Sequence, residues 1–181
     1  MLEKAIEVFA AHGYEGTSTE ELLEVMGISR QSMYNAFGDK RRLYLQALQR
    51  YTVASVSDQI RVLAAPSSAL KGIRALLDFA VSKSVADSDP TCLGISAICE
   101  FGRSDPEITM VFEMAGRTFQ AALERRMTEA REKGETGRET DPQIAAQFIQ
   151  ATLTGIKIAA RAGATEQHLR GIARLALRGL Q

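Results

Sequence analysis

The sequence predicts an all-α protein of about nine helices, with three short helices at the N-terminus followed mostly by longer ones. Three observations lead to this fold class. Apolar residues recur at intervals of three and four along most of the 181-residue chain, which places them on one side of a helix. Serine, threonine or aspartate precedes most of these runs, where its side chain can cap the first turn. No segment shows the apolar–polar alternation that is typical of a half-buried strand.

The first two helices are short, and each ends at a glycine. Helical spacing begins at Leu2 and stops at Gly13; the apolar residues of this helix are Leu2, Ala5, Ile6, Phe9 and Ala10. Residues 18–21, Ser-Thr-Glu-Glu, form a capping box that opens a second helix, and Gly27 ends it. Leu22, Leu23 and Met26 form the apolar side of this second helix.

A third short helix and a long fourth helix follow. Ser29 is a suitable N-cap for a helix that runs through Phe37. Asp39 can cap the fourth helix, which is expected from Lys40 to about Leu63. The second and third helices, with the tight turn between them, have the lengths of a helix-turn-helix motif.

The middle of the chain contains two more helices separated by breaks. A loop at residues 65–68, Ala-Pro-Ser-Ser, separates the fourth helix from one expected over residues 70–85. The next break is predicted at Asp87–Pro90. A short apolar helix is expected over residues 93–101, and Gly102 ends it.

The last three helices begin at recognisable caps. Asp105-Pro106 and Asp141-Pro142 each place an N-cap before a proline at the first helical position, where the missing N–H of proline has no partner to lose. Thr165 is the N-cap of the final helix. These helices are expected to end near Gly134, Ala162 and Leu180.

Charge and composition narrow the possible functions. The 22 Lys and Arg residues balance the 22 Asp and Glu residues, so the chain is not a basic protein that binds nucleic acid without regard to sequence. The longest uncharged segment, residues 142–156, is shorter than the roughly 20 apolar residues of a membrane span. The N-terminus lacks the apolar stretch of a signal peptide. We therefore expect a cytoplasmic protein without membrane contacts.

The third helix has an apolar side and a polar side when its residues are placed about 100° apart. The apolar side consists of Met33, Ala36 and Phe37, and the polar side of Gln31 and Asn35, with Arg30, Ser32 and Tyr34 at its edges. Glutamine and asparagine amides can pair with adenine, an arginine guanidinium with guanine, and a serine hydroxyl with either base. The sequence therefore predicts that this helix contacts bases in the major groove of DNA.

Phosphate contacts are expected around the same helix. The residues placed to make them are Tyr34, Thr17 and Ser18 at the start of the second helix, and Lys40, Arg41 and Arg42 at the start of the fourth. Residues 29–42 carry four positive charges and one negative charge, so the positive charge is local. The alternative is a short amphipathic helix in a bundle, whose polar side is simply solvated.

Two segments resemble the TetR (tetracycline repressor)/AcrR family of transcriptional regulators. They are residues 5–18, AIEVFAAHGYEGTS, and residues 26–40, MGISRQSMYNAFGDK. The similar features are a Phe-containing first helix that ends in Gly-Tyr, a Thr-Ser pair, a Gly-Ile-Ser turn and a Tyr-x-x-Phe-Gly-x-Lys pattern. The resemblance implies an all-α homodimer that binds a near-palindromic operator, most simply as a repressor, and leaves the DNA when a small-molecule inducer binds its body.

The resemblance also assigns roles to residues and a division to the chain. It implies phosphate contacts by Tyr34, Lys40 and either Thr17 or Ser18, and contacts at or near bases by Arg30, Gln31, Ser32 and Asn35. It implies a DNA-binding domain over residues 1–50 and a ligand-binding and dimerisation domain over residues 51–181. Family members usually carry a basic arm before the first helix, whereas this sequence begins inside that helix, so either the sequence is trimmed or the contacts of that arm are missing.

The last two helices carry more apolar and small residues than one buried side requires. We expect them to pair with their copies in a four-helix dimer interface; the alternative is a core contained wholly within one chain. The interface residues that we expect are Phe148, Thr152, Ile156, Leu169, Ile172 and Leu175.

A pocket for the unknown effector is expected among the middle helices. The candidate lining residues are Phe79, Ile95, Cys99, Met110, Phe112, Met114, Phe119 and Thr152. We interpret Cys92 and Cys99 as buried, unreactive thiols, because the charges near Cys92 are the acidic Asp87, Asp89 and Glu100, which do not stabilise a thiolate. The alternative is a redox or electrophile sensor.

No enzymatic activity, cofactor or metal site is expected. The two histidines, His12 and His168, and the two cysteines do not have the spacing of a zinc site, and the chain has no Gly-rich loop or nucleophile motif. Two alternatives to a repressor remain: a helical adaptor that does not bind DNA, and a transcriptional activator of the same family.

Overall fold

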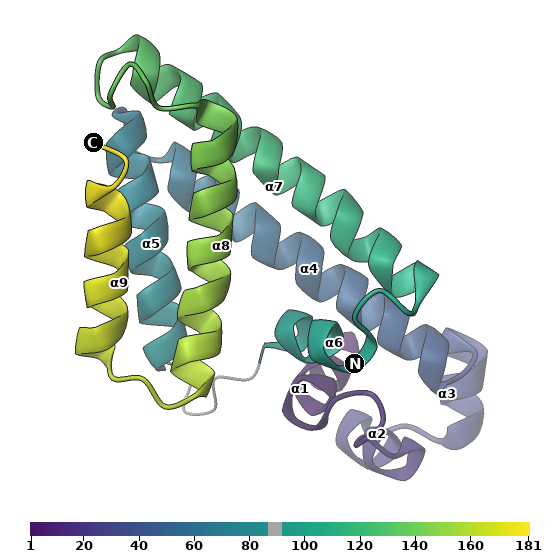
Figure 1. Cartoon of the computed structure of the whole chain (residues 1–181). Coiled ribbons are helices and arrows are strands. Elements are labelled where there is room, and N and C mark those ends of the chain that lie inside the picture. Colours follow the sequence, from purple (N-terminus) through teal and green to yellow (C-terminus); the bar gives the residue numbers. More distant parts are fainter. Residues whose placement is uncertain (87–91) are drawn as a thin grey trace. The chain divides into compact units, whose positions relative to one another are not determined.

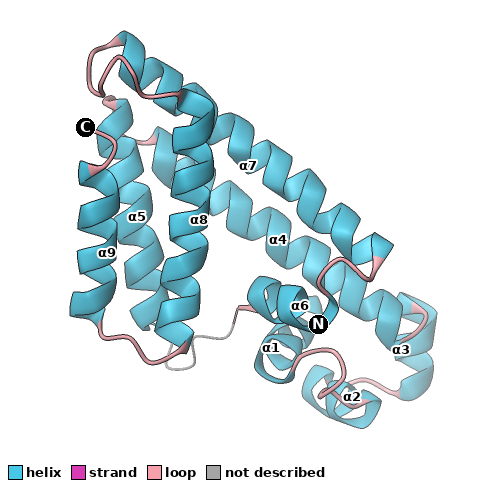
Figure 2. Ribbon diagram, in the orientation of Figure 1, coloured by secondary structure: helices cyan, strands magenta, loops and turns pink. Residues whose placement is uncertain are grey.

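The computed structural model describes residues 1–86 and 92–181, and within these ranges the regular structure is entirely helical (Figure 1 and Figure 2). The nine helices of the described residues are α1 (Leu2–His12), α2 (Thr19–Met26), α3 (Arg30–Phe37), α4 (Lys40–Ala64), α5 (Ala69–Ala86), α6 (Leu93–Phe101), α7 (Pro106–Glu132), α8 (Pro142–Arg161) and α9 (Glu166–Arg178). The all-α prediction is confirmed, although α9 ends two residues before Leu180. The predicted break at Asp87–Pro90 lies outside the described residues.

The predicted N-caps accept hydrogen bonds at the helix starts. The Ser18 hydroxyl accepts one from the Glu21 N–H at 3.0 Å, which caps α2. The Asp39 carboxylate accepts one from the Arg42 N–H at 2.8 Å at the start of α4. The helices α3, α7, α8 and α9 are capped in the same way by Ser29, Asp105, Asp141 and Thr165. Local side chains therefore determine where these helices begin.

The described chain packs as two compact units. The first comprises the described residues of 1–55 and 91–115, and the second those of 56–90 and 116–181. The helices α4 and α7 each contribute residues to both units. No helix in residues 1–86 and 92–181 combines the length and the apolar character that crossing a membrane requires.

The core of the first unit includes residues from beyond the predicted DNA-binding segment. Phe9 of α1, Met33 of α3 and Leu48 of α4 are fully buried in one cluster with Leu93 of α6 and Ile108 of α7. Residues 1–50 thus share their core with α6 and the start of α7. A functional division after residue 50 stays a prediction, since packing alone does not assign functions to the two sides.

The second unit is built around α5, α8 and α9, which pack against one another (Figure 1). Ile73 of α5, Leu153 of α8 and Ala173 of α9 belong to its core. Two of the expected interface residues, Ile156 and Leu169, are also fully buried there. Their assignment to a dimer interface needs correction, because side chains that are already enclosed by their own chain offer no surface to a partner.

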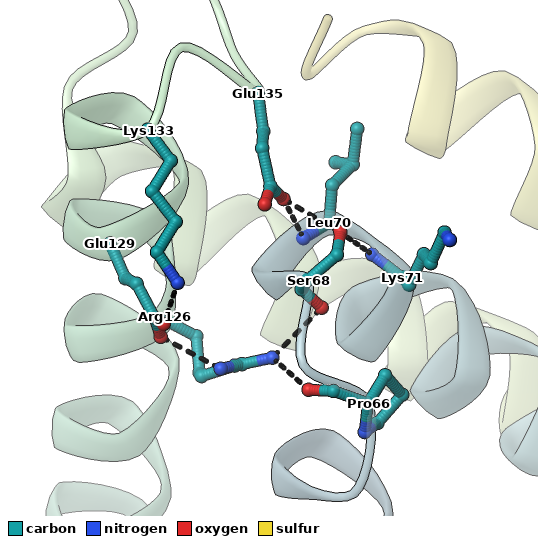
Figure 3. Close-up of polar contacts among 8 residues, drawn as sticks. All are labelled: Pro66, Ser68, Leu70, Lys71, Arg126, Glu129, Lys133 and Glu135. Atoms are coloured by element: carbon teal, nitrogen blue, oxygen red, sulfur yellow. Dashed lines mark hydrogen bonds and ion pairs between the residues drawn. The ribbon is translucent and has the colours of Figure 1, made fainter.

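A polar cluster joins the start of α5 to the end of α7 within the second unit (Figure 3). One carboxylate oxygen of Glu135 accepts hydrogen bonds from the Leu70 backbone N–H at 2.7 Å and the Ser68 hydroxyl at 2.8 Å. The Arg126 guanidinium donates to the carbonyl oxygens of Pro66 and Ser68, both at 2.9 Å. Glu135 thereby bonds one of the N–H groups that an α-helix leaves without a partner in its first turn.

The variant Glu135→Gln is expected to lower the free energy of unfolding at neutral pH by about 1 kcal/mol, since a neutral amide oxygen is the weaker acceptor. The Leu70 N–H and the Ser68 hydroxyl hold the pKa of the Glu135 carboxyl below its ordinary value. A lowered pKa in the folded state stabilises the protein above the unfolded pKa, and this contribution is lost as the pH falls through the folded pKa. Urea unfolding at neutral and acidic pH should therefore show a smaller pH dependence in Glu135→Gln.

The matched control for this prediction is Glu132→Gln, at an exposed position in the last turn of α7. It makes the same carboxylate-to-amide change three residues away. We expect its unfolding free energy to follow that of the unchanged chain at both pH values. Equal losses of unfolding free energy in the two variants would show that the Glu135 bonds at the start of α5 do not stabilise the fold.

Candidate DNA interface

A glycine turn connects α2 to α3. Gly27 has a φ of 68° and a ψ of 39°, a left-handed conformation that glycine adopts without the steric cost of a Cβ atom. The N–H groups of Gly27 and Ile28 donate to the Leu23 carbonyl oxygen at 3.0 and 3.1 Å. Ser29 then caps α3. Two eight-residue helices and this turn form the predicted helix-turn-helix.

The two sides of α3 differ in burial. Met33 is fully buried in the core of the first unit, and Phe37 is half-buried against that core. Gln31 and Asn35 are exposed, and 47% of Tyr34 is exposed. The predicted polar side is therefore confirmed as a solvent-facing side. One detail differs: Ala36, which the helical positions placed on the apolar side, is exposed in the last turn of α3.

Gln31 and Asn35 form one amide pair on this exposed side. The Gln31 Nε2 donates a hydrogen bond to the Asn35 Oδ1 at 2.9 Å, across one turn of the helix. The bond uses one of the two hydrogens of the Gln31 amide and leaves its oxygen available, together with both hydrogens of the Asn35 amide. The pair therefore presents donors and an acceptor of the kind that bind adenine edges.

The other two predicted base contacts are exposed but already bonded. The Arg30 guanidinium forms an ion pair with the Glu20 carboxylate of α2. The Glu20 backbone N–H and the Arg30 guanidinium hold the pKa of the Glu20 carboxyl below its ordinary value. The Ser32 hydroxyl lies 2.9 Å from that of Ser29. Arg30 has donors left for a base, because a guanidinium carries five N–H groups.

Of the two hydroxyls predicted for a phosphate at α2, the structure favours one. Thr17 is only 1% exposed, and its Oγ1 donates to the Gly13 carbonyl oxygen at 2.6 Å. Its hydroxyl proton is thus used inside the chain, so the prediction that Thr17 binds a phosphate needs correction. Ser18 is exposed, and its oxygen accepts the cap hydrogen bond, which leaves its own proton for an external acceptor.

The basic residues at the start of α4 also differ in what they contact. The Lys40 Nζ lies 4.3 Å from the centre of the Tyr14 ring, and Lys40 is half-buried there. The Arg41 guanidinium forms ion pairs with Asp105 and with Glu107, the latter at 3.3 Å. The expectation that Arg41 binds a phosphate therefore needs correction, because two carboxylates of the first unit occupy it.

Comparison with known proteins assigns the family. Residues 1–47 match the family model described as bacterial regulatory proteins, tetR family, and residues 69–176 match the tetracyclin repressor-like C-terminal domain. The chain belongs to the TetR family. It is therefore a transcriptional regulator, and members of this family are not enzymes, which agrees with the predicted lack of enzymatic activity.

Several TetR-family relatives resemble almost the whole chain. The uncharacterized HTH-type transcriptional regulator YezE of Bacillus subtilis is 32% identical over 174 residues, covering 93% of this chain and 88% of YezE. The HTH-type transcriptional repressor ComR of Escherichia coli is 25% identical over 98% of this chain and 85% of ComR. A cysteine mutant of the TetR family regulator CifR, solved with operator DNA, is 28% identical with a TM-score of 0.85, covering 99% of this chain and 95% of that one.

The pocket candidates of this TetR-family chain divide between the two units. The first unit contains Ile95, Cys99, Met110, Phe112 and Met114, and the second contains Phe79, Phe119 and Thr152. Met110 and Met114 are more than half exposed, whereas Ile95 and Phe119 are buried. The Thr152 hydroxyl donates to the Phe148 carbonyl oxygen of its own helix at 2.9 Å. That these residues line one pocket stays a prediction.

The prediction that both thiols are buried is wrong for Cys99, which is exposed on α6. Cys92 is half-buried, and the Tyr51 hydroxyl donates to its Sγ at 3.1 Å. Asp87 and Asp89, on which the argument about charges near Cys92 partly rested, lie outside the described residues.

An exposed apolar stripe lies on α8, and of its large side chains the sequence analysis named only Phe148 as an interface residue, without Ile144 and Ile158. Ile144, Phe148 and Ile158 are 60, 44 and 50% exposed, and the exposed Ala151 and Gly155 lie between them. These five positions are spaced by four, three, four and three residues, the repeat that forms a seam along one side of a helix. The spacing was visible in the sequence, but it was merged with the buried stripe on the other side of α8.

Proposed function

We propose that this TetR-family chain is a cytoplasmic repressor that binds a near-palindromic operator as a homodimer and leaves it when a small-molecule inducer binds. The observation that carries the proposal is the exposed amide pair of Gln31 and Asn35, on the side of α3 opposite the buried Met33. A helix with this division can pack on its own domain and still enter a major groove. The similarity to ComR, a transcriptional repressor, and to CifR, whose structure was solved with operator DNA, supports the same function.

The proposed DNA contacts follow from the chemistry and exposure of each side chain. Gln31 and Asn35 bind base edges, and Arg30 and Ser32 assist at neighbouring bases after exchanging their present partners. The proposed phosphate ligands are Ser18, Tyr34 and Lys40. Phosphate contacts hold the helix in register, and the base contacts provide the sequence preference.

The proposed dimer uses the exposed side of α8 together with α9. The α8 stripe provides Phe148 as its aromatic side chain, and Leu175 of α9 is 71% exposed. Ile172 is half-buried on α9, and Thr152 is half-buried on α8. Large apolar side chains of this exposure are typical of surfaces that a partner covers. Two copies would present two α3 helices, as a near-palindromic operator requires.

The inducer site is proposed within residues 51–181, the segment that we assign to ligand binding and dimerisation, with residues 1–50 assigned to DNA binding. The exposed Met110 and Met114 suit an adaptable apolar surface, because methionine side chains are flexible.

A gel shift with the DNA upstream of the chain's own gene tests the proposal. Tyr34→Ala is expected to weaken binding by about tenfold through loss of a phosphate hydrogen bond. The slope of log affinity against log salt should stay unchanged, because a neutral hydroxyl releases no counterion. Gln49→Ala, at an exposed position on α4, is the control and should bind as the unchanged chain does. Failure of the unchanged chain to bind, or binding that does not depend on salt, would reject the proposal.

A further inference from the structure

We propose that Glu100 of α6 is a positioning residue for DNA binding, because its carboxylate fixes the loop between α1 and α2 on which the phosphate ligands depend. The inference rests on the proposed function, since it concerns the same DNA-binding surface. It goes further by placing a residue outside the helix-turn-helix in control of that surface. All residues involved belong to the first compact unit.

The Glu100 carboxylate bonds two successive backbone N–H groups. Its Oε2 accepts from the Tyr14 N–H at 2.8 Å, and its Oε1 accepts from the Glu15 N–H at 2.7 Å. Each oxygen has its own donor, so a carboxylate satisfies both N–H groups, whereas an amide offers only one oxygen. Hydrogen bonds to an ionised acceptor are about twice as strong as those between neutral groups. We call these two bonds the Glu100 contact.

The loop has a residue that permits this close approach. Gly13 has a φ of 73°, a conformation that side chains other than glycine rarely adopt. A Cβ atom added at this position would lie 3.0 Å from the Glu100 Oε2. The backbone conformation therefore favours glycine here, and a side chain at this position would also push the Glu100 carboxylate away by a few tenths of an ångström.

Phe101, the residue after Glu100, packs against the side chain of Tyr14, one of the two loop residues that Glu100 bonds. The centre of the Phe101 ring lies 5.8 Å from that of Tyr14, and the Tyr44 ring of α4 lies 5.1 Å from Tyr14. A basic group also contacts this ring, since the Lys40 Nζ lies 4.3 Å from the Tyr14 ring centre. Residues 100 and 101 thus hold both the backbone and the ring of Tyr14, and Tyr14 in turn contacts Lys40.

The loop also determines where α2 begins. The Thr17 hydroxyl donates to the Gly13 carbonyl oxygen at 2.6 Å, which fixes the last loop residue before Ser18. Two proposed phosphate ligands, Ser18 and Lys40, therefore depend on a loop that Glu100 holds. Loss of the Glu100 contact is expected to misplace these ligands without altering α3, because no residue of α3 takes part in it.

The test uses the full chain with Glu100→Gln, and Glu100→Ala as a stronger change. The control is Glu113→Gln, the same carboxylate-to-amide change in the same unit, where the carboxylate lies 3.3 Å from the exposed Arg103. Hydrogen exchange on the free protein measures protection of the Tyr14 and Glu15 amides. Gel shifts with the DNA upstream of the chain's own gene, across a salt series, measure affinity and the number of phosphate contacts.

We expect faster exchange of both amides in Glu100→Gln, an affinity about tenfold lower and a salt slope reduced by about one or more per dimer. Glu113→Gln should match the unchanged chain in all three measurements. Unchanged amide exchange, or faster exchange with unchanged affinity, would overturn the inference, as would weaker binding with the salt slope preserved. Failure of the proposed function is distinguishable, since the unchanged chain itself would then bind no fragment.

Discussion

Replacing Gln31 and Asn35 together with alanine is expected to remove most of the preference for operator over random DNA while leaving the fold intact. A bidentate contact between an amide and a base discriminates against a wrong base by about 1–3 kcal/mol. Two such residues, present twice in a dimer, therefore provide a preference of at least about a hundredfold. Both side chains are exposed, so their loss should change the free energy of unfolding by no more than about 0.5 kcal/mol.

The measurement is a competition experiment in which labelled operator is displaced by unlabelled operator or by random duplex at one salt concentration. The Gln31→Ala, Asn35→Ala double variant should be displaced almost equally by both. Lys40→Ala serves as the contrast, because loss of a phosphate ligand weakens binding to both duplexes alike and keeps their ratio. A ratio that survives in the double variant would place base recognition elsewhere on the chain.

Local signals in the sequence were sufficient to predict where the helices begin. Ser18, Asp39 and the two Asp-Pro pairs each act on N–H groups two or three residues away, so their effect does not depend on distant packing. The buried side of α3 was predicted for a related reason. The helical period alone places Met33 on the apolar side of α3, whatever surrounds the helix, and Met33 is buried.

Contacts between distant residues could not be predicted in this way. Tyr14 and Glu100 are separated by 86 positions, and Arg41 and Asp105 by 64, and no local pattern relates the members of either pair. The same limitation explains the error at Thr17. Its hydroxyl has suitable chemistry for a phosphate, but the fold buries it against the Gly13 carbonyl oxygen.

The helix α8 shows why a count of apolar residues was insufficient for the proposed interface. Ile149, Leu153 and Ile156 are buried, whereas Ile144 and Phe148 on the same helix are exposed. A helix with apolar residues on two sides can pack inside its chain with one of them and present the other. The sequence indicated the excess of apolar residues correctly, but the division between the two sides required the packing of α5 and α9 against α8.

The variant Phe148→Glu is expected to convert the proposed dimer into a monomer at micromolar concentration. Phe148 is the aromatic residue of the exposed α8 stripe and is 44% exposed in the single chain. Burying an unpaired carboxylate in an interface costs roughly 3 kcal/mol or more, which raises the dissociation constant of the dimer at least about a hundredfold. Size-exclusion chromatography with light scattering measures the change in mass directly.

Operator affinity should fall in the same variant, because a monomer brings one α3 helix to the DNA and loses the gain of about a hundredfold or more that linking two binding modules provides. Val85→Glu is the matched control, since Val85 of α5 has the same 44% exposure but lies outside α8 and α9. It should remain a dimer and bind as the unchanged chain does.

A dimeric Phe148→Glu chain would exclude the α8 stripe from the interface, whereas a monomeric unchanged chain would exclude the dimer itself. Reduced operator binding by Phe148→Glu, with normal folding and a monomeric mass, would connect the α8 surface to DNA binding through assembly, because residue 148 belongs to the second compact unit and every proposed DNA ligand belongs to the first.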